Sequence, residues 1–93
     1  MLQLQFFGLI RLLLKRETME LVWAEGDTVQ RVLGRAQEQA ATPFVSKLLD
    51  DRGAPRAGTI ILVNRRNILH LQGLQTPLAD GDTLAFFPPG AGG

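Results

Sequence analysis

Strict alternation of apolar and polar residues opens the chain. In residues 2–6, three apolar side chains alternate with two glutamines, a pattern typical of a strand with one buried face. If the alternation continues, Phe7 falls on the glutamine face, where it is either a contact residue or the sign of a bulge at Gly8. We therefore expect a first strand with an aromatic residue at the end of its outer face.

The next apolar segment, residues 9–14, fits neither a helical nor a strand period clearly. We expect it to form the first hairpin together with the polar residues 15–18. Residues 19–23 then place their large apolar side chains at every second position, which predicts a second strand.

Helical spacing replaces alternation in the middle of the chain. Apolar residues recur every three or four positions over residues 29–40, and either Asp27 or Thr28 suits the N-cap of this helix. Thr42-Pro43 is a second start signal, because proline is tolerated at the first helical position. It predicts a short second helix that ends near Gly53.

The last third of the chain returns to strand patterns. Residues 59–63 are almost wholly apolar, which favours a well-buried strand. Residues 64–67 predict a turn with asparagines in left-handed conformations, and residues 68–71 a short returning strand. Residues 80–82, Asp-Gly-Asp, predict a tight turn before a last strand over residues 83–87.

This order of elements predicts an α+β fold. The amphipathic helix covers one face of the sheet, and the first and last strands lie parallel through a right-handed crossover. Alternation then places Phe7 and Phe87 near each other on the outer face. An exposed aromatic pair that leads into a terminal segment suggests a docking surface, unless loops cover one or both rings.

The terminal segment after Phe87 consists of two prolines and four small residues, Pro88, Pro89, Gly90, Ala91, Gly92 and Gly93. Proline fixes φ near −65° and favours an extended residue before it, so we expect a stiff projection from the fold. Two final glycines without Cβ atoms suit entry into a narrow channel. The alternative is a frayed terminus, as in most domains.

Composition limits the possible functions. The 93 residues make one domain of ordinary apolar content, with a net charge of +1 and no dense basic face, which argues against nucleic-acid binding. The absence of cysteine excludes disulfides, thiolate metal sites and cysteine catalysis, and suits a cytoplasmic location. No apolar run reaches the ~20 residues that would span a membrane. Ser46 and His70 have no third partner for a catalytic triad.

The last third resembles the ubiquitin-like sulfur carriers, and most of all the small subunit of molybdopterin synthase. The resemblance rests on Ile61–Asn64, on Pro77–Pro89, which holds the Asp-Gly-Asp and Phe-Phe-Pro-Pro sequences, and on the terminal Gly92-Gly93. It implies a β-grasp (ubiquitin-like) fold: a mixed sheet of four to five strands covered by one main helix and a short second helix. The domain would cover residues 1–87, and residues 88–93 would form a flexible tail.

The resemblance also implies the chemistry. An E1-like activating enzyme would use ATP and Mg²⁺ to adenylate the Gly93 carboxylate, and a sulfur donor protein would convert it to a thiocarboxylate. The tail, with Gly92, would enter the large subunit of molybdopterin synthase and supply sulfur for the dithiolene. The chain would bind no metal or cofactor and would not be an enzyme by itself, because its partners supply the base and the oxyanion stabilisers.

The same logic selects the docking residues. Phe7 and Phe87 would anchor the partner, with Ile68 as a lesser contact, because buried aromatic side chains dominate interfaces. The tail that threads the partner would consist of Pro88, Pro89, Gly90, Ala91, Gly92 and Gly93. Three alternatives stay open: a sulfur carrier of another pathway (thiamine, tungsten cofactor or amino-acid synthesis), a protein modifier joined to lysine through its terminal glycine, and a β-grasp interaction module that is never activated.

Overall fold

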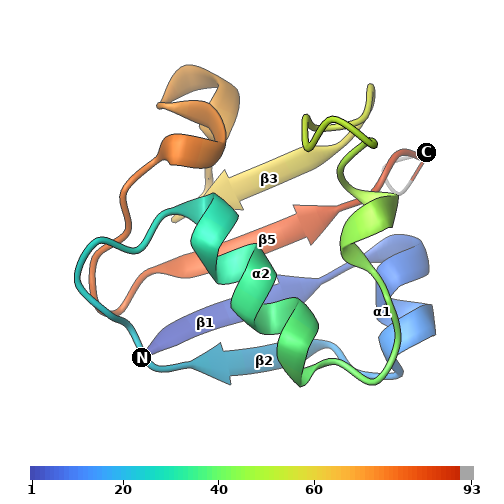
Figure 1. The fold of residues 1–93 in the computed structure, drawn as a ribbon, viewed down its shortest axis with the longest axis horizontal. Coiled ribbons are helices and arrows are strands. Elements are labelled where there is room, and N and C mark those ends of the chain that lie inside the picture. Colours follow the sequence, from blue (N-terminus) through green and yellow to red (C-terminus); the bar gives the residue numbers. More distant parts are fainter. Residues whose placement is uncertain (91–93) are drawn as a thin grey trace.

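A five-stranded mixed sheet forms the centre of the computed structural model, which describes residues 1–90 (Figure 1). The strand order is β2-β1-β5-β3-β4; β1 and β5 are parallel, and the other neighbours are antiparallel. The strands are β1 Leu2–Phe6, β2 Thr18–Leu21, β3 Ile60–Val63, β4 Arg66–Asn67 and β5 Thr83–Phe87. The expected α+β architecture, with parallel first and last strands, is confirmed.

Helix α2, Val29–Gln39, covers one face of this sheet (Figure 1). Its Thr28 N-cap accepts a hydrogen bond at Oγ1 from the N–H of Arg31, at 3.2 Å. The predicted helix and one of its two candidate caps are therefore confirmed. Apolar side chains of the helix and of the two central strands fill the space between them and are almost fully buried: Val29, Val32, Leu33, Ala36, Leu2, Leu4, Phe6, Leu84 and Phe86.

The hairpin predicted over residues 9–18 is wrong, because Gly8–Leu14 form a helix, α1. It begins at a glycine with φ of 60° and ends at Lys15, which has φ of 55° in the left-handed region. Only Ile10 of this helix is buried, whereas Leu12 is 70% exposed. The apolar run is thus a short helix with leucines on its outer side, which explains why no period fitted it.

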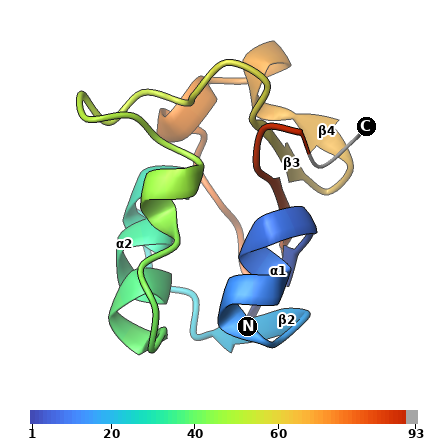
Figure 2. The ribbon, with the colours of Figure 1, turned by 90° about the vertical axis from the view of Figure 1, so that its right-hand side faces the viewer.

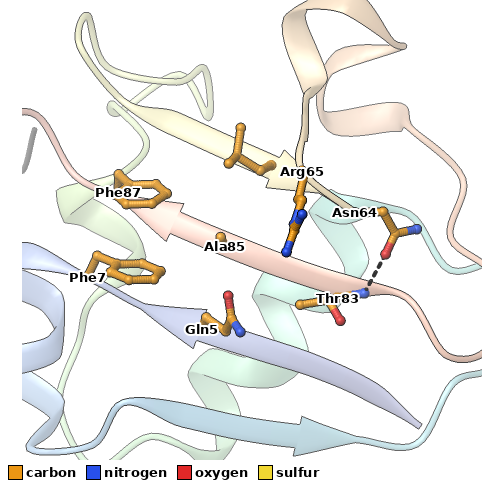
Figure 3. Close-up of a pocket in the computed structure, with 8 residues that line it drawn as sticks. Gln5, Phe7, Asn64, Arg65, Thr83, Ala85 and Phe87 are labelled. Carbon is orange, nitrogen blue, oxygen red and sulfur yellow. Dashed lines mark hydrogen bonds between the residues drawn. The ribbon is translucent and has the colours of Figure 1, made fainter.

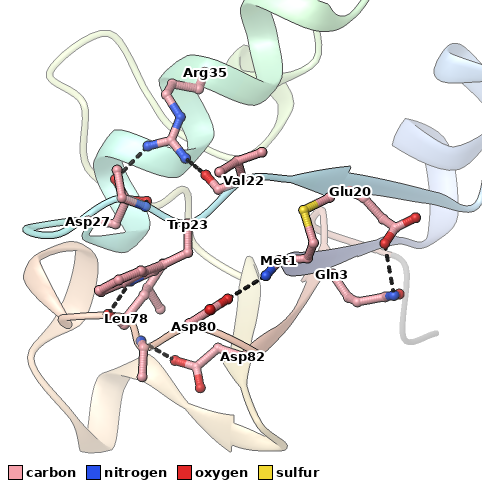
Figure 4. Close-up of polar contacts among 12 residues, drawn as sticks. Met1, Gln3, Glu20, Val22, Trp23, Asp27, Arg35, Leu78, Asp80 and Asp82 are labelled. Atoms are coloured by element: carbon pink, nitrogen blue, oxygen red, sulfur yellow. Dashed lines mark hydrogen bonds and ion pairs between the residues drawn. The ribbon is translucent and has the colours of Figure 1, made fainter.

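Strand β2 is shifted from its predicted range and ends at Leu21 rather than at Trp23. The indole of Trp23 turns toward the loop before β5, where its Nε1–H donates a hydrogen bond to the carbonyl of Leu78 at 2.8 Å (Figure 4). Trp23 is half-buried and packs against the core from this loop position. The side chain of Trp23 therefore links the segment after β2 to the loop before β5 and does not extend strand β2.

A buried ion pair holds the loop that leads into α2 (Figure 4). The carboxylate of Asp27, 3% exposed, accepts hydrogen bonds from the guanidinium of Arg35 and, at 2.9 Å, from the N–H of Ala24. Arg35 also donates to the carbonyl of Val22 at 2.8 Å. The hydrogen bond from Arg35 lowers the pKa of Asp27 below its usual 3.8, although burial opposes this shift.

The prediction of a second helix that starts at Thr42-Pro43 is wrong, because only one short 3-10 turn, η1 Val45–Lys47, lies between Pro43 and Gly53. The backbone hydrogen bonds after Leu48 explain the difference. The N–H of Asp50 donates to the carbonyl of Ala54 at 2.7 Å, and the carbonyl of Leu48 accepts from the N–H of Arg56 at 2.8 Å, so these groups are not free for a helical ladder. The Oε1 of Gln37 accepts hydrogen bonds from the N–H groups of Phe44 and Val45, at 2.8 and 3.0 Å, and caps the start of the short turn. The apolar residues of this segment are still buried, namely Phe44, Leu48 and Leu49.

The returning strand also differs from its prediction, since it comprises Arg66–Asn67 (β4) rather than residues 68–71. Only Asn64 and Arg65 form the turn, with φ of 49° and 70°, so the strand begins two residues earlier than expected. The next residues wind into a 3-10 turn, η2 Ile68–His70, which the side chain of Asn67 caps by accepting from the N–H of Leu69 at 2.9 Å. A further 3-10 turn, η3 Gly73–Gln75, follows it.

Candidate functional site

The end of β5 is the root of the predicted tail, and Figure 2 shows it between α1 and β3. Pro88 is buried, whereas Pro89 and Gly90 are exposed. Gly58, with φ of 89°, lies against Pro89: a Cβ at Gly58 would stand 3.4 Å from the Cβ of Pro89. The fold thus supports the chain for two residues beyond β5. Residues 91–93, on which the predictions for Ala91, Gly92 and Gly93 fall, lie outside the described residues.

Phe7 and Phe87 stack beside this root on the outer face of the sheet (Figure 3). Their ring centroids are 4.3 Å apart and their planes meet at 10°. The parallel pairing of β1 with β5 produces this contact, because the N–H of Phe7 donates to the carbonyl of Phe86 at 3.1 Å. Both rings are half-buried, so each leaves part of its surface open. The predicted proximity of the two side chains is confirmed.

A shallow hollow of about 530 Å³ extends from the stack along the outer face of β5 (Figure 3). Ala85 and Leu62 give it an apolar floor, and its other lining residues are Gln5, Asn64, Arg65 and Thr83. Arg65 is the one charged residue among them. Sequence reasoning missed this hollow, because its members come from three strands and a turn whose lateral order no local pattern reveals.

Ile68 does not belong to this surface. Its side chain is 2% exposed and packs in the core at the start of η2. The prediction that Ile68 contacts a partner is therefore wrong. The error arises because β4 lies closer to the N-terminus than predicted, so that Ile68 falls in the turn η2 and not in the strand. The neighbouring Leu69, 73% exposed, is the apolar residue of this turn that faces outward.

The side chains of residues 1–90 that were considered for catalysis or metal binding lie apart from one another. No three of their histidine, aspartate and glutamate side chains gather closely enough to hold a metal ion. His70 and Ser46 are exposed on separate 3-10 turns, η2 and η1. Over the same residues, no helix has the length and apolarity needed to cross a membrane. What this part of the chain presents is a surface and an anchored terminal segment.

A central parallel pair of strands and one helix across the sheet define the ubiquitin-like β-grasp class of folds. The crystal structure of SAMP1 from Haloferax volcanii has this fold: it superimposes with a TM-score of 0.82 at 23% identity, over 99% of this chain and 98% of that one. The predicted β-grasp fold is confirmed.

The family follows from the sequence comparison. The ThiS family matches residues 4–93, so the chain belongs to the ThiS family of ubiquitin-like sulfur carriers. It is 35% identical over 94 residues to small archaeal modifier protein 3 of Haloferax volcanii, with 99% of this chain and 98% of that protein covered. It is 32% identical to the Haloferax volcanii HVO 2177 protein, whose solution structure superimposes with a TM-score of 0.77 over 99% of this chain and 85% of that one. The chain is therefore a ubiquitin-like sulfur carrier or modifier.

Proposed function

We propose that this chain acts through the carboxylate of Gly93, which an E1-like enzyme activates and a second partner receives. The observation that carries the proposal is the half-buried stack of Phe7 on Phe87 immediately before the supported prolines. Aromatic side chains with open surface are the usual anchors of an interface. A partner that docks on this stack would meet the tail where it leaves the fold.

The activation has two balanced steps. A carboxylate oxygen of Gly93 attacks the α-phosphorus of ATP, held with Mg²⁺ by the activating enzyme, and pyrophosphate leaves. A nucleophile then attacks the acyl carbon of the adenylate, and AMP leaves with the bonding electron pair. The nucleophile is either a persulfide sulfur from a donor protein, whose S–S bond a thiol then reduces to give the thiocarboxylate, or the amine of a lysine, which loses a proton and gives an isopeptide. The partners provide the base and the oxyanion donors.

The residues of this chain bind and orient. Phe7 and Phe87 anchor the partner, and the buried Pro88 with Pro89 on Gly58 sets the direction in which the tail leaves. Main-chain hydrogen bonds along an extended segment hold such a tail in a channel. In this proposal the tail from Gly90 onward threads the active site of the partner, and the carrier itself performs no catalysis.

Two acceptors of the activated group are open to a direct test. The modifier role, with a lysine as acceptor, is supported by the 35% identity to a small archaeal modifier protein along almost its whole length. The role as small subunit of molybdopterin synthase, with sulfur delivered to the dithiolene through the large subunit, is supported by the Asp-Gly-Asp and Phe-Phe-Pro-Pro sequences of residues 80–89. Both roles share the activation of Gly93.

The first experiment measures the intact mass of the full chain. The chain is incubated with the E1-like enzyme of its own organism, ATP, Mg²⁺ and a sulfur donor, and a matched sample lacks ATP. We expect an ATP-dependent gain equal to one oxygen-to-sulfur exchange, located at Gly93 by fragmentation, which also tests whether Gly93 is the mature terminus. If the mass does not increase, and protein isolated from its own cells carries no isopeptide at Gly93, the remaining hypothesis is a β-grasp interaction module that is never activated.

Peptide mapping then separates the two acceptors. An isopeptide between Gly93 and a lysine of another protein identifies the modifier. Dithiolene formation from the thiocarboxylated chain and the large synthase subunit identifies the molybdopterin synthase subunit. A thiocarboxylate that supports neither reaction points to another sulfur-transfer pathway.

A further inference from the structure

Arg65 has a backbone conformation that its residue type does not favour. It is the second residue of the two-residue turn between β3 and β4, and its φ is 70°. Turns with positive φ at both central residues prefer Asn-Gly, because a Cβ is costly in the left-handed region. Asn64 satisfies this preference at the first position, whereas the second position carries a long cationic side chain. An arginine at such a position invites a functional explanation.

Hydrogen bonds fasten the turn to the start of β5. The N–H of Asn64 donates to the carbonyl of Thr83 at 2.8 Å, and the N–H of Thr83 donates back to Oδ1 of Asn64 at 2.9 Å. Nδ2 of Asn64 also donates to the carboxylate of Asp82 at 2.8 Å. The backbone of Arg65 is therefore fixed, and Figure 3 shows its side chain lying over the sheet toward Ala85.

The guanidinium of Arg65 has no hydrogen bond or ion pair with the described part of the chain, residues 1–90. The other residues that line the hollow are neutral. Asp82 lies immediately before β5, but its carboxylate already accepts hydrogen bonds from Asn64 and, at 2.8 Å, from the N–H of Ala79. The donors of Arg65 thus face the solvent above an apolar floor that ends at Phe87.

We propose that Arg65 is a specificity-determining residue of this surface and pairs with an aspartate or glutamate of the activating enzyme. The inference rests on the proposed function, because activation is the step common to both candidate roles. A guanidinium presents a planar set of donors that matches a carboxylate in a two-pronged pair. The enzyme that docks its apolar side chains on Phe7 and Phe87 therefore carries a carboxylate over Ala85, about two residues back along β5.

The test is the steady-state kinetics of ATP-dependent pyrophosphate release, with the full chain as the varied substrate of the activating enzyme and with a sulfur donor and a thiol present, so that the acyl adenylate is consumed and the enzyme turns over. We expect Arg65→Glu to raise KM about tenfold, because it places like charges opposite each other, with kcat unchanged and the difference reduced at high salt. The matched control is Arg66→Glu, which makes the same charge change on the next residue. Arg66 lines a different hollow with Leu71 and Gln72. The KM of the Arg66→Glu variant should therefore differ from that of the wild-type chain by less than about twofold.

A second variant separates recognition from stability. Glycine suits the left-handed backbone, so Arg65→Gly should keep or raise the melting temperature while it raises KM about threefold. Equal KM increases for Arg65→Glu and Arg66→Glu would overturn the proposal, since the change in net charge alone would explain them. An unchanged KM for both Arg65→Glu and Arg65→Gly would also overturn it. If the wild-type chain releases no pyrophosphate, the proposed function itself fails. Normal wild-type kinetics with indifferent variants refute only the role of Arg65.

Discussion

Two neighbouring phenylalanines at the end of β5 allow docking to be separated from folding. Phe86 points into the core, where it is 0% exposed and its ring centroid lies 6.1 Å from that of Phe6. Phe87 points to the outer face, where it is half-buried and stacked on Phe7. The two residues share the same strand and side chain, so Phe86→Ala and Phe87→Ala form a matched pair that differs only in the face of the sheet.

The expected losses of stability differ severalfold. Replacement of a fully buried phenylalanine by alanine costs about 3–5 kcal/mol, a large part of the ~5–14 kcal/mol expected for a domain of this length. Phe87 forfeits the aromatic pair, worth about 0.5–1.5 kcal/mol, and little core packing. Because about 1 kcal/mol shifts the melting temperature of a domain of this size by about 4–8 °C, Phe86→Ala should lower it by at least about 12 °C and Phe87→Ala by less.

The kinetic losses should run in the opposite order. If Phe87 is an interface anchor, its truncation removes about 2 kcal/mol of binding and raises KM for the activating enzyme about 30-fold, measured where the variant is fully folded. Leu69→Ala, which truncates an apolar side chain that is 73% exposed, is the surface control and should leave KM unchanged. A Phe87→Ala variant that melts as early as Phe86→Ala and keeps its KM would refute the docking surface, because Phe87 would then act only as a core residue.

Further predictions concern the loop before α2 and the tail. Asp27→Asn should cost about 2–3 kcal/mol of unfolding free energy in urea titrations, because it breaks a buried pair whose arginine is partly solvated. The folded pKa of Asp27 is lowered, so its contribution is present above about pH 4 and is lost as pH falls through the folded pKa; the variant should lack this dependence. Gly58→Ala should cost about 1–2 kcal/mol through its positive φ and lower the melting temperature, whereas its new Cβ would make only an ordinary contact with Pro89. Gly92→Val should fold normally yet show no mass gain with the activating enzyme, and a normal gain would contradict the narrow-channel model.

The central strands were predictable because their alternation is undisturbed. Residues 2–6 bury every second side chain, and residues 83–87 place Leu84 and Phe86 in the core with Ala85 buried between them, so a one-residue slip of either strand would move its core side chains to the outer face. The positions of Phe7 and Phe87 follow from that alternation and from the parallel pairing. The aromatic half of the candidate site was therefore available from the sequence.

The peripheral segments were not predictable, because hydrogen bonds to other segments or special backbone conformations decide them. Nothing local distinguishes residues 44–49 from a helix; the backbone groups of Leu48 and Asp50 bond instead to residues 54–56. Helix α1 ends at a left-handed lysine instead of the glycine that usually marks such an end. The position of Arg65 over β5 likewise depends on the bonds between Asn64 and Thr83, which pair residues far apart in sequence.

In the proposed function, the two unlike contacts on the outer face determine where the carboxylate of Gly93 goes. Arg65 lies over the part of β5 near Ala85, and Phe87 ends the same strand, immediately before the buried Pro88. From Ala85 to Phe87 a strand advances about 7 Å, so a charged contact and an aromatic contact along it fix the direction of β5 on the partner as well as its position. A single anchor would leave the domain free to rotate about it. Because the buried Pro88 and the turn at Pro89 and Gly90 follow β5 directly, a partner that fixes the direction of the strand also fixes the place from which the proposed tail starts.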